Sequence, residues 1–304
     1  MERQEIIEIA VGHSHDEVQS VEQITGKGQV NEISLVTTVT NAKYVLRADP
    51  NESTIERFNK EKWCMETAKA AGILVPEILD VSLTKNGQSY MLLSYVVGTN
   101  GQDTDPSSQK EIWRVLGSYA KKIHAFPVSG YGEKMVAPGE FEGSWLAYVD
   151  YNISSLNADD KLLSLNIITE AESAFLKSIF EQLKNTDFNF GLIHNDLSLK
   201  NTIVGPDGEV YLLDWGSAQV DVVPHMDFAE IAYSSLKTDS EDFRVFLDNY
   251  GMSTDAFNGI KGEMDRLQLL AFTDKVRWAI DRNSDLVEPK VAEFRGVLEK
   301  IKEV

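Results

Sequence analysis

Apolar and polar residues alternate along the first third of the chain. Between residues 24 and 47, apolar or β-branched side chains occupy every second position from Ile33 to Val39, which is the period of a half-buried strand. A second strand-like run covers residues 90–97 and stops at Gly98. This part of the chain is therefore predicted to be rich in strands.

A helical signal separates these two strand-rich runs. Ser53 and Glu56 have the spacing of a capping box, and Gly72 is a typical helix stop. Residues 54–71 are therefore predicted to form one helix.

A polar, turn-rich connector follows at residues 99–108. Ser108 and Glu111 then form a second capping box, and apolar residues recur at helical spacing. Helical patterns dominate the rest of the chain, apart from the short apolar runs of residues 191–214. The pattern predicts an α+β protein, with a small sheet domain at residues 1–97 and a larger, mainly helical domain at residues 98–304.

Charge narrows the classes of partner. The 304 residues include 48 acidic and 29 basic side chains, for a formal net charge of −19. Such a field repels phosphate backbones and anionic lipids, so we expect neither nucleic acid nor a membrane as a partner. An acidic surface favours a cationic substrate, or it serves solubility alone.

The sequence also favours a cytoplasmic location. Cys64 is the single cysteine, so no intrachain disulfide can form. The first eight residues are acidic where a signal peptide would be basic, and no apolar stretch approaches the ~18 residues that a membrane span needs.

Residues 191–216 carry the most informative chemistry. A Gly-Pro-Asp-Gly turn at residues 205–208 separates two apolar runs, which should pair as a hairpin. With the turn centred on its Pro-Asp bond, Asn201 lies opposite Leu212, two residues from Asp214. The hairpin is therefore predicted to bring Asn201 and Asp214 together at its open end.

An amide oxygen beside a carboxylate offers the hard ligands that Mg²⁺ prefers, with water and substrate phosphates completing its shell. Asn201 and Asp214 are therefore candidate metal ligands. Asp196, upstream in the same loop, is placed to meet an incoming hydroxyl group.

These residues carry a resemblance to a known family. His194-x-Asp196-x-x-x-x-Asn201, followed by Asp214-Trp-Gly216, resembles the catalytic and metal-binding loops of the aminoglycoside phosphotransferase and choline kinase group, relatives of the protein kinases. The resemblance implies a bilobal protein-kinase-like fold, with a small antiparallel-sheet N-lobe and a larger helical C-lobe. It also implies that Asp196 is the catalytic base and that Asn201 and Asp214 bind Mg²⁺.

A buried carboxylate on the predicted helix supports the same family. Phe58, Glu61, Met65 and Ala68 share one helical face, and a charge on that face is costly unless a cation pairs with it. Arg47, on the preceding strand, is the obvious partner. The resemblance implies that this pair positions the nucleotide phosphates, although kinases usually carry lysine in place of Arg47.

Two further segments are candidates for nucleotide binding. Gly26, Gly28 and Asn31 resemble the family's short glycine loop, which covers the phosphates, but an ordinary turn explains them equally well. Residues 90–97 match the family's hinge, where the backbone around Ser94 and Val96 would bind a purine edge. Backbone contacts leave little mark in sequence, so the choice between ATP and GTP stays open.

The acceptor is less defined than the nucleotide. The resemblance implies a small hydroxyl-bearing molecule, such as an aminoglycoside, an amino alcohol or a sugar. We expect its pocket between the catalytic loop and the helical segments around residues 140–185 and 255–285. Those segments contain five acids and a tryptophan that could meet it: Asp150, Glu263, Asp265, Asp274, Trp278 and Asp281. Each of these taken singly is also explained as a solvated helix face.

Two functional hypotheses remain. The first is a phosphotransferase that moves the terminal phosphoryl group of ATP or GTP to a small molecule. The second is a nucleotide-binding pseudokinase that acts as a regulatory or interaction module, which only Arg47 and the reduced glycine loop favour.

Asp227 resembles the family's aspartate that braces the catalytic loop, and a helix cap is compatible with that role.

Overall fold

The computed structural model describes residues 1–24 and 32–303, which form two compact units. The first unit comprises Met1–Val115, Ala137–Gly139 and Ser198–Ala218, and the second comprises Leu116–Val136, Glu140–Leu197 and the chain from Gln219 onward. The first unit is built on antiparallel sheet and the second is mainly helical, which confirms the predicted fold class. The lobe boundary after residue 97 stays a prediction.

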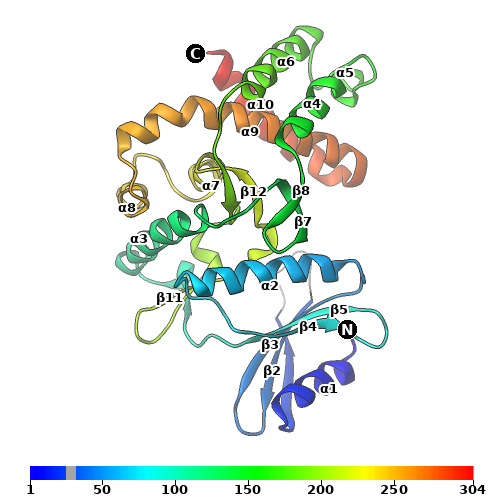
Figure 1. The fold of residues 1–304 in the computed structure, drawn as a ribbon, viewed down its shortest axis with the longest axis vertical. Coiled ribbons are helices and arrows are strands. Elements are labelled where there is room, and N and C mark those ends of the chain that lie inside the picture. The colour runs from blue at the N-terminus through cyan, green and yellow to red at the C-terminus, as the bar shows by residue number, and fades with distance from the viewer. Residues whose placement is uncertain (25–31, 304) are drawn as a thin grey trace. The chain divides into compact units, whose positions relative to one another are not determined.

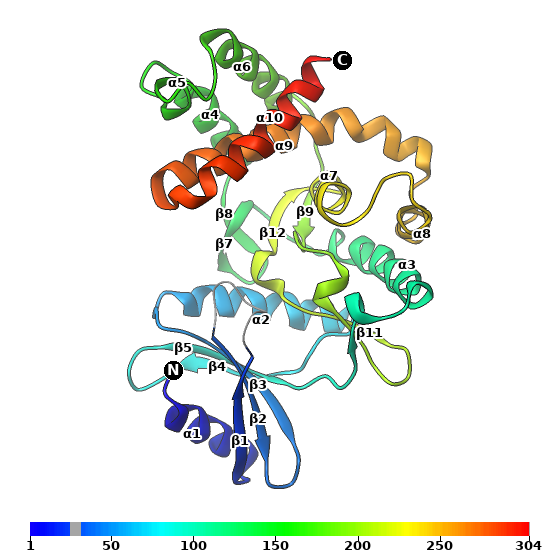
Figure 2. The same ribbon diagram turned by 180° about the vertical axis from the view of Figure 1, so that it is seen from behind.

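A five-stranded antiparallel sheet forms the body of the first unit, in the order β1-β2-β3-β5-β4. Its strands are β1 (Val18–Gln23), β2 (Glu32–Thr38), β3 (Lys43–Asp49), β4 (Ile78–Leu83) and β5 (Ser89–Ser94). Because side chains alternate across a strand, Leu46 and Ala48 of β3 face helix α1 (Arg3–Ser14), while Arg47 faces helix α2 (Thr54–Ala70). The two helices cover opposite faces of the sheet (Figures 1 and 2).

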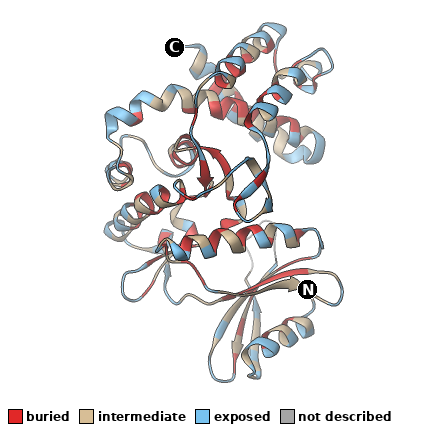
Figure 3. Cartoon of the chain, in the orientation of Figure 1, coloured by how far each residue is buried: buried red, intermediate tan, exposed pale blue. Residues whose placement is uncertain are grey.

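The predicted helix at residues 54–71 is confirmed as α2, with the expected face buried (Figure 3). Its capping box is wrong, because the Ser53 side chain makes no cap hydrogen bond and backbone turns take the first N–H groups. The second capping box is also wrong. Helix α3 (Pro106–Ile123) begins earlier, and Asp105 accepts hydrogen bonds from the N–H groups of Ser107 and Ser108.

The predicted hairpin is confirmed, with a different register. Strands β10 (Thr202–Val204) and β11 (Val210–Leu212) pair so that Thr202 faces Leu212, and β6 (Thr99–Asn100) adds a third strand. The turn is therefore centred on Asp207, one half-residue beyond the prediction. Asn201 consequently lies opposite Leu213, and its carbonyl accepts a hydrogen bond of 2.8 Å from the Leu213 N–H.

Among the described residues, the second unit combines a small sheet with the seven helices from α4 to α10. Its sheet has the order β8-β7-β12-β9, formed by β7 (Tyr131–Ala137), β8 (Glu140–Gly143), β9 (Phe190–Ile193) and β12 (Gln219–Val222). The helices are α4 (Trp145–Ser155), α5 (Lys161–Ser164), α6 (Glu170–Lys184), α7 (His225–Glu230), α8 (Glu241–Tyr250), α9 (Thr254–Arg282) and α10 (Val287–Lys302). Helix α9 packs against α4, α5, α6, α7 and α10, so it is the centre of this unit's core (Figure 2).

No helix within residues 1–24 and 32–303 combines the length and apolarity that crossing a lipid bilayer requires.

Candidate functional site

A chain of paired charges runs through the first unit. Arg47 Nη1 donates to Glu61 Oε2 at 2.5 Å and Nη2 donates to Oε1 at 3.3 Å, while Nη2 also lies 3.7 Å from Asp214 Oδ1. The Glu61 side chain is fully buried, so the predicted cationic partner is where the burial argument requires it. Burial by itself lowers the pKa of Arg47, but the negative charges of Glu61 and Asp214 raise it overall, so the guanidinium stays charged.

Two residues fix the loop that carries Asp214. Lys60, on the buried side of α2, donates from Nζ to the carbonyls of Gly216 at 3.1 Å and Ala218 at 2.7 Å. A Cβ atom added at Gly216 would lie 3.2 Å from Glu61 Oε1 and 3.4 Å from Asp214 Oδ1. The loop is therefore held against α2, and Gly216 permits the close approach. The sequence analysis did not identify Lys60, because a lysine on a helix is usually exposed on the surface.

Asn201 and Asp214 end neighbouring strands of one hairpin. Asp214 adopts a left-handed backbone conformation with φ 55°, and its side chain is 55% exposed. This places a reachable carboxylate one residue beyond the position opposite Asn201. The observed register brings the two residues one position closer than predicted.

The donor set at this hairpin fits Mg²⁺. In the part of the chain that the structure describes, no group of three or more His, Cys, Asp or Glu side chains could hold a metal ion by itself. Mg²⁺ does not need one, because it is typically held by one or two protein oxygens together with water and substrate phosphates. Asn201 and Asp214 could supply those oxygens.

A buried carboxylate holds the backbone of the predicted catalytic loop in the second unit. Asp227 is fully buried and accepts hydrogen bonds from the N–H groups of His194 at 3.1 Å and Asn195 at 2.7 Å. Asn195 has φ 62°, a left-handed conformation, and Asp196 follows it as a half-buried residue. Asp227 therefore lies where the sequence hypothesis placed it, bracing the residues before Asp196 from a following helix.

His124, which the sequence analysis did not single out, completes this brace. Its Nε2 lies 3.0 Å from Asp227 Oδ2, and its Nδ1 lies 3.0 Å from the Tyr250 hydroxyl. Burial alone would raise the pKa of Asp227, but hydrogen bonds from His124 and Asn195 and the charges of His124 and His194 lower it overall. The brace therefore keeps a carboxylate inside the core.

Of the backbone N–H groups of Ser94, Tyr95 and Val96 in the predicted hinge, one is available to bind a purine. The Ser94 N–H donates to Glu77 O at 2.8 Å and the Tyr95 N–H donates to Lys43 O at 3.3 Å. Among the described residues, none accepts a hydrogen bond from the N–H of Val96. Of the two predicted base-binding positions, Val96 is therefore the better placed.

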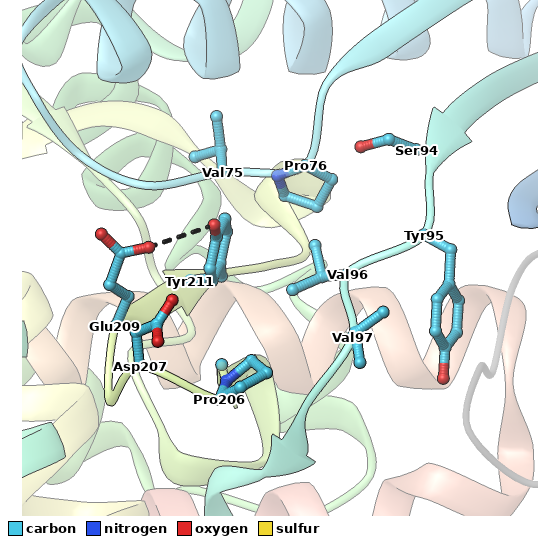
Figure 4. A pocket seen from close by; sticks show the side chains of 11 residues that line it. Val75, Pro76, Ser94, Tyr95, Val96, Val97, Pro206, Asp207, Glu209 and Tyr211 are labelled. Carbon is cyan, nitrogen blue, oxygen red and sulfur yellow. Dashed lines mark hydrogen bonds between the residues drawn. The ribbon is translucent and has the colours of Figure 1, made fainter. Parts of the chain in front are cut away.

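A small cavity lies beside this hinge (Figure 4). Residues of the hinge, of the chain after α2 and of the hairpin turn line it: Val75, Pro76, Ser94, Tyr95, Val96, Val97, Gly205, Pro206, Asp207, Glu209 and Tyr211. Its volume of about 260 Å³ is below the range of ~300–1,000 Å³ that is typical of small-molecule sites, so we do not assign a nucleotide to it. The predicted loop residues Gly26, Gly28 and Asn31 lie outside the described residues.

A larger cavity of about 630 Å³ lies within the second unit. Its lining includes four aromatic residues, Tyr131, Trp145, Tyr148 and Tyr151, which we call the aromatic wall, together with apolar residues of α7 and α9. Asn195 of the catalytic loop also lines it, next in sequence to Asp196. The cavity therefore has the size of a small-molecule site and is lined by the residue that precedes the candidate base.

Only one of the six predicted acceptor residues, Asp274, lines this cavity. Four of the other acids pair elsewhere: Asp150 with Lys184, Glu263 with His225, Asp265 with Lys300, and Asp281 with Lys161. Trp278 is 48% exposed and also lies outside the lining. The sequence analysis missed the aromatic wall, although Trp145, Tyr148 and Tyr151 recur at helical spacing on α4. That spacing is equally typical of an ordinary core face, and Tyr131 comes from a separate strand.

The comparisons with known proteins agree with this geometry. The sequence model described as "Phosphotransferase enzyme family" matches residues 21–268, which is most of the chain. No curated protein matches the sequence significantly.

The fold is that of solved aminoglycoside phosphotransferases. The GDP complex of wild-type aminoglycoside 2′-phosphotransferase-IIIa superposes with a TM-score of 0.72 at 14% identity, covering 99% of each chain. Aminoglycoside phosphotransferase APH(4)-Ia superposes with a TM-score of 0.70 at 14% identity, covering 98% of this chain and 99% of that chain. Spectinomycin phosphotransferase APH(9)-Ia, solved with ADP and spectinomycin, gives 0.58 at 14% identity, with 98% and 97% covered.

Identities this low show the fold alone, whereas the family match spans more than half of the sequence. The chain therefore belongs to the phosphotransferase enzyme family.

Proposed function

We propose that this protein transfers the terminal phosphoryl group of ATP or GTP to a hydroxyl group of a small molecule. The observation that supports this most is the charge chain of the first unit, in which Arg47 contacts both the buried Glu61 and the exposed Asp214. Such an arrangement leaves a cation and an accessible carboxylate next to each other, as phosphate and metal binding require.

Four residues of the first unit have roles in nucleotide binding. The Val96 N–H binds the purine edge, and Arg47, held by Glu61, presents its guanidinium to the phosphates. Asn201 and Asp214 would hold Mg²⁺, which would neutralise charge on the nucleotide phosphates.

Asp196 acts on the acceptor. Its carboxylate orients the attacking hydroxyl and takes its proton late, while the oxygen bonds to the terminal phosphorus and the bond to the nucleoside diphosphate breaks. Asp227 and His124 hold the preceding backbone, so that Asp196 starts from a fixed position. A cytoplasmic location is part of the proposal, because it supplies the nucleoside triphosphate.

The test is acceptor-dependent release of nucleoside diphosphate. The purified protein is incubated with ATP or GTP and Mg²⁺ against a panel of aminoglycosides, amino alcohols and sugars, beside an Asp196→Ala variant. We expect release that the variant lacks, with nucleotide affinity unchanged in that variant.

Equal turnover by the Asp196→Ala variant would refute the assigned base. Tight Mg²⁺-dependent nucleotide binding without turnover on any acceptor would instead favour the regulatory pseudokinase, for which the arginine at position 47 speaks.

A further inference from the structure

The large cavity of the second unit has an unusual balance of charge and apolar surface. Four carboxylates and two lysines line it, and the rest of the lining is mostly aromatic and aliphatic. Glu142 pairs with Lys134 at 2.7 Å, and Lys275 lies over the Phe272 ring at 5.4 Å. Glu133, another of these carboxylates, is exposed, so water screens its charge, and the less exposed Asp221 and Asp274 are the carboxylates that decide binding.

Asp221 is buried and already satisfied. Its Oδ1 accepts from the Val222 N–H at 2.8 Å, and its Oδ2 accepts from Gln219 Nε2 at 2.8 Å. Burial raises the pKa of Asp221 to about 6. Both of its oxygens already accept hydrogen bonds and the residue is 3% exposed, so little of this carboxylate is accessible to a ligand cation.

Asp274 is different. No hydrogen bond or salt bridge joins its carboxylate to any other residue in the described parts of the chain. The nearest guanidinium, Arg277, is engaged by Asn152 at 2.7 Å and by Asp160 at 2.7 Å. Asp274 is only half-buried, so its charge is open to whatever enters the cavity. A half-buried carboxylate without a partner is costly, and a cationic ligand group would offset that cost.

The aromatic wall suits the same ligand. Tyr131 lies 5.4 Å from both Trp145 and Tyr148, centroid to centroid, and Tyr151 is 56% exposed. Aromatic faces attract an ammonium group electrostatically and also pack against an apolar body. One open, half-buried carboxylate beside these aromatic residues provides for one ammonium group and an apolar remainder, because the exposed Glu133 is screened by water.

We propose that the acceptor bound in this cavity is a hydroxyl compound with a single ammonium group and an apolar or aromatic body, anchored by Asp274. The inference rests on the proposed function, since it names the substrate class of the same site. A polycationic aminoglycoside fits less well, because much of the lining is aromatic or aliphatic and would leave some of its further ammonium and hydroxyl groups poorly paired.

The test is a binding measurement that needs no turnover. Leucinol, phenylalaninol and tryptophanol are each paired with the neutral alcohol in which a methyl group replaces the ammonium, and kanamycin serves as the polycation. Isothermal titration calorimetry gives the dissociation constants for the full chain without nucleotide. We expect at least one amino alcohol to bind about tenfold or more tightly than its neutral partner and more tightly than kanamycin.

Two acid-to-amide variants locate the anchor. Asp274→Asn should remove the preference for the ammonium compound, whereas Asp281→Asn, on the same helix but paired with Lys161 outside the cavity, should keep it. A preference that survives Asp274→Asn, equal binding of every neutral partner, or tighter binding of kanamycin would each overturn the proposal.

A second pair of variants keeps the test open if Asp274→Asn fails to fold. Tyr151 is exposed, so its replacement should be tolerated, and Tyr151→Leu should weaken the ammonium preference severalfold while Tyr151→Phe retains it. Equal preference in both variants would count against the aromatic wall.

Failure of this inference can be told from failure of the proposed function. Nucleoside diphosphate release is recorded separately with the same compounds. Ammonium-selective binding without turnover would refute only the phosphotransferase, whereas turnover on neutral alcohols or kanamycin alone would refute only the acceptor class.

Discussion

The two regions that we propose to bind the nucleotide and the acceptor differ in how their charges are balanced. In the first unit, Glu61 and Asp214 share the guanidinium of Arg47. In the cavity of the second unit, Asp221 is buried without a cation in hydrogen-bonding contact, and Asp274 has no paired charge among the described residues. The first region is thus organised before any ligand arrives, whereas the second keeps one open acidic group, Asp274, that a ligand would neutralise.

This difference predicts whether an acid-to-amide mutation raises or lowers the stability of the protein. Replacing an acid by its amide in the balanced region removes one member of a pair and should cost activity or stability. The same change in the cavity removes an unfavourable buried charge and should stabilise the protein. The predictions below test this contrast, beginning with the largest effect.

The largest effect is expected for Asp214→Asn. The variant keeps the shape of the loop but loses the exposed carboxylate, so we expect kcat/KM to fall by about a thousandfold and Mg²⁺-dependent nucleotide affinity to fall strongly. Steady-state kinetics and nucleotide titrations with and without Mg²⁺ measure this. Asp207→Asn, in the exposed hairpin turn, is the matched control and should behave like the wild type.

Next in size is Asp227→Asn, which alters the brace of the catalytic loop. The amide places an N–H group where one of three donors now points, so we expect a loss of about 3 kcal/mol in the free energy of unfolding. The value of kcat should fall while nucleotide affinity, a property of the first unit, stays within about twofold.

A double-mutant cycle with His124→Gln separates this brace from a general packing defect. Because His124 contacts Asp227 directly, we expect a coupling energy of about 1–2 kcal/mol in chemical denaturation. Strictly additive losses would mean that the two residues do not act as a pair.

Asp221→Asn should give a smaller effect of the opposite sign. The folded protein holds the pKa of Asp221 at about 6, above the ordinary value of 3.8, so ionisation costs stability as pH rises through this window. The variant avoids that cost. We therefore expect it to be more stable than the wild type by about 2 kcal/mol at pH 8, and the gain to disappear near pH 4.

Urea denaturation at several pH values measures this difference, with the exposed Glu142→Gln as a control that should show no such dependence. A loss of stability at pH 8 would remove the contrast between the two regions.

The same contrast explains what the sequence could predict. The pairing of Arg47 with Glu61 was predictable, because a carboxylate on a buried helical face needs a cation and Arg47 lies on the preceding strand. The approach of Arg47 to Asp214 was not predicted. The hairpin was predictable for a similar reason. It depends on short-range pattern, namely the spacing from Asp196 to Asn201 and the turn before Asp214. Only the hairpin register differed, because turn composition leaves the centre of the turn open by half a residue.

Tertiary contacts account for what was missed. Ser53 and Ser108 had capping-box spacing, but backbone turns and Asp105 took the donors instead. Lys60 can be buried because loop carbonyls 156 and 158 residues later in the chain accept hydrogen bonds from its ammonium group. Five acids or aromatics named for the acceptor pocket lie elsewhere, since helical spacing alone does not tell which exposed face borders a cavity.

The smallest effect is expected for Arg47→Lys. The guanidinium makes two hydrogen bonds to Glu61 and still approaches Asp214, whereas one ammonium group cannot span all three oxygens with the same geometry. The charge of Glu61 remains paired, so we expect a loss of only about 1 kcal/mol, seen as a roughly fivefold higher KM for the nucleotide at nearly unchanged kcat. If kcat instead rose severalfold, Arg47 would be a handicap to catalysis, and the balanced region would be better suited to holding a nucleotide than to using it.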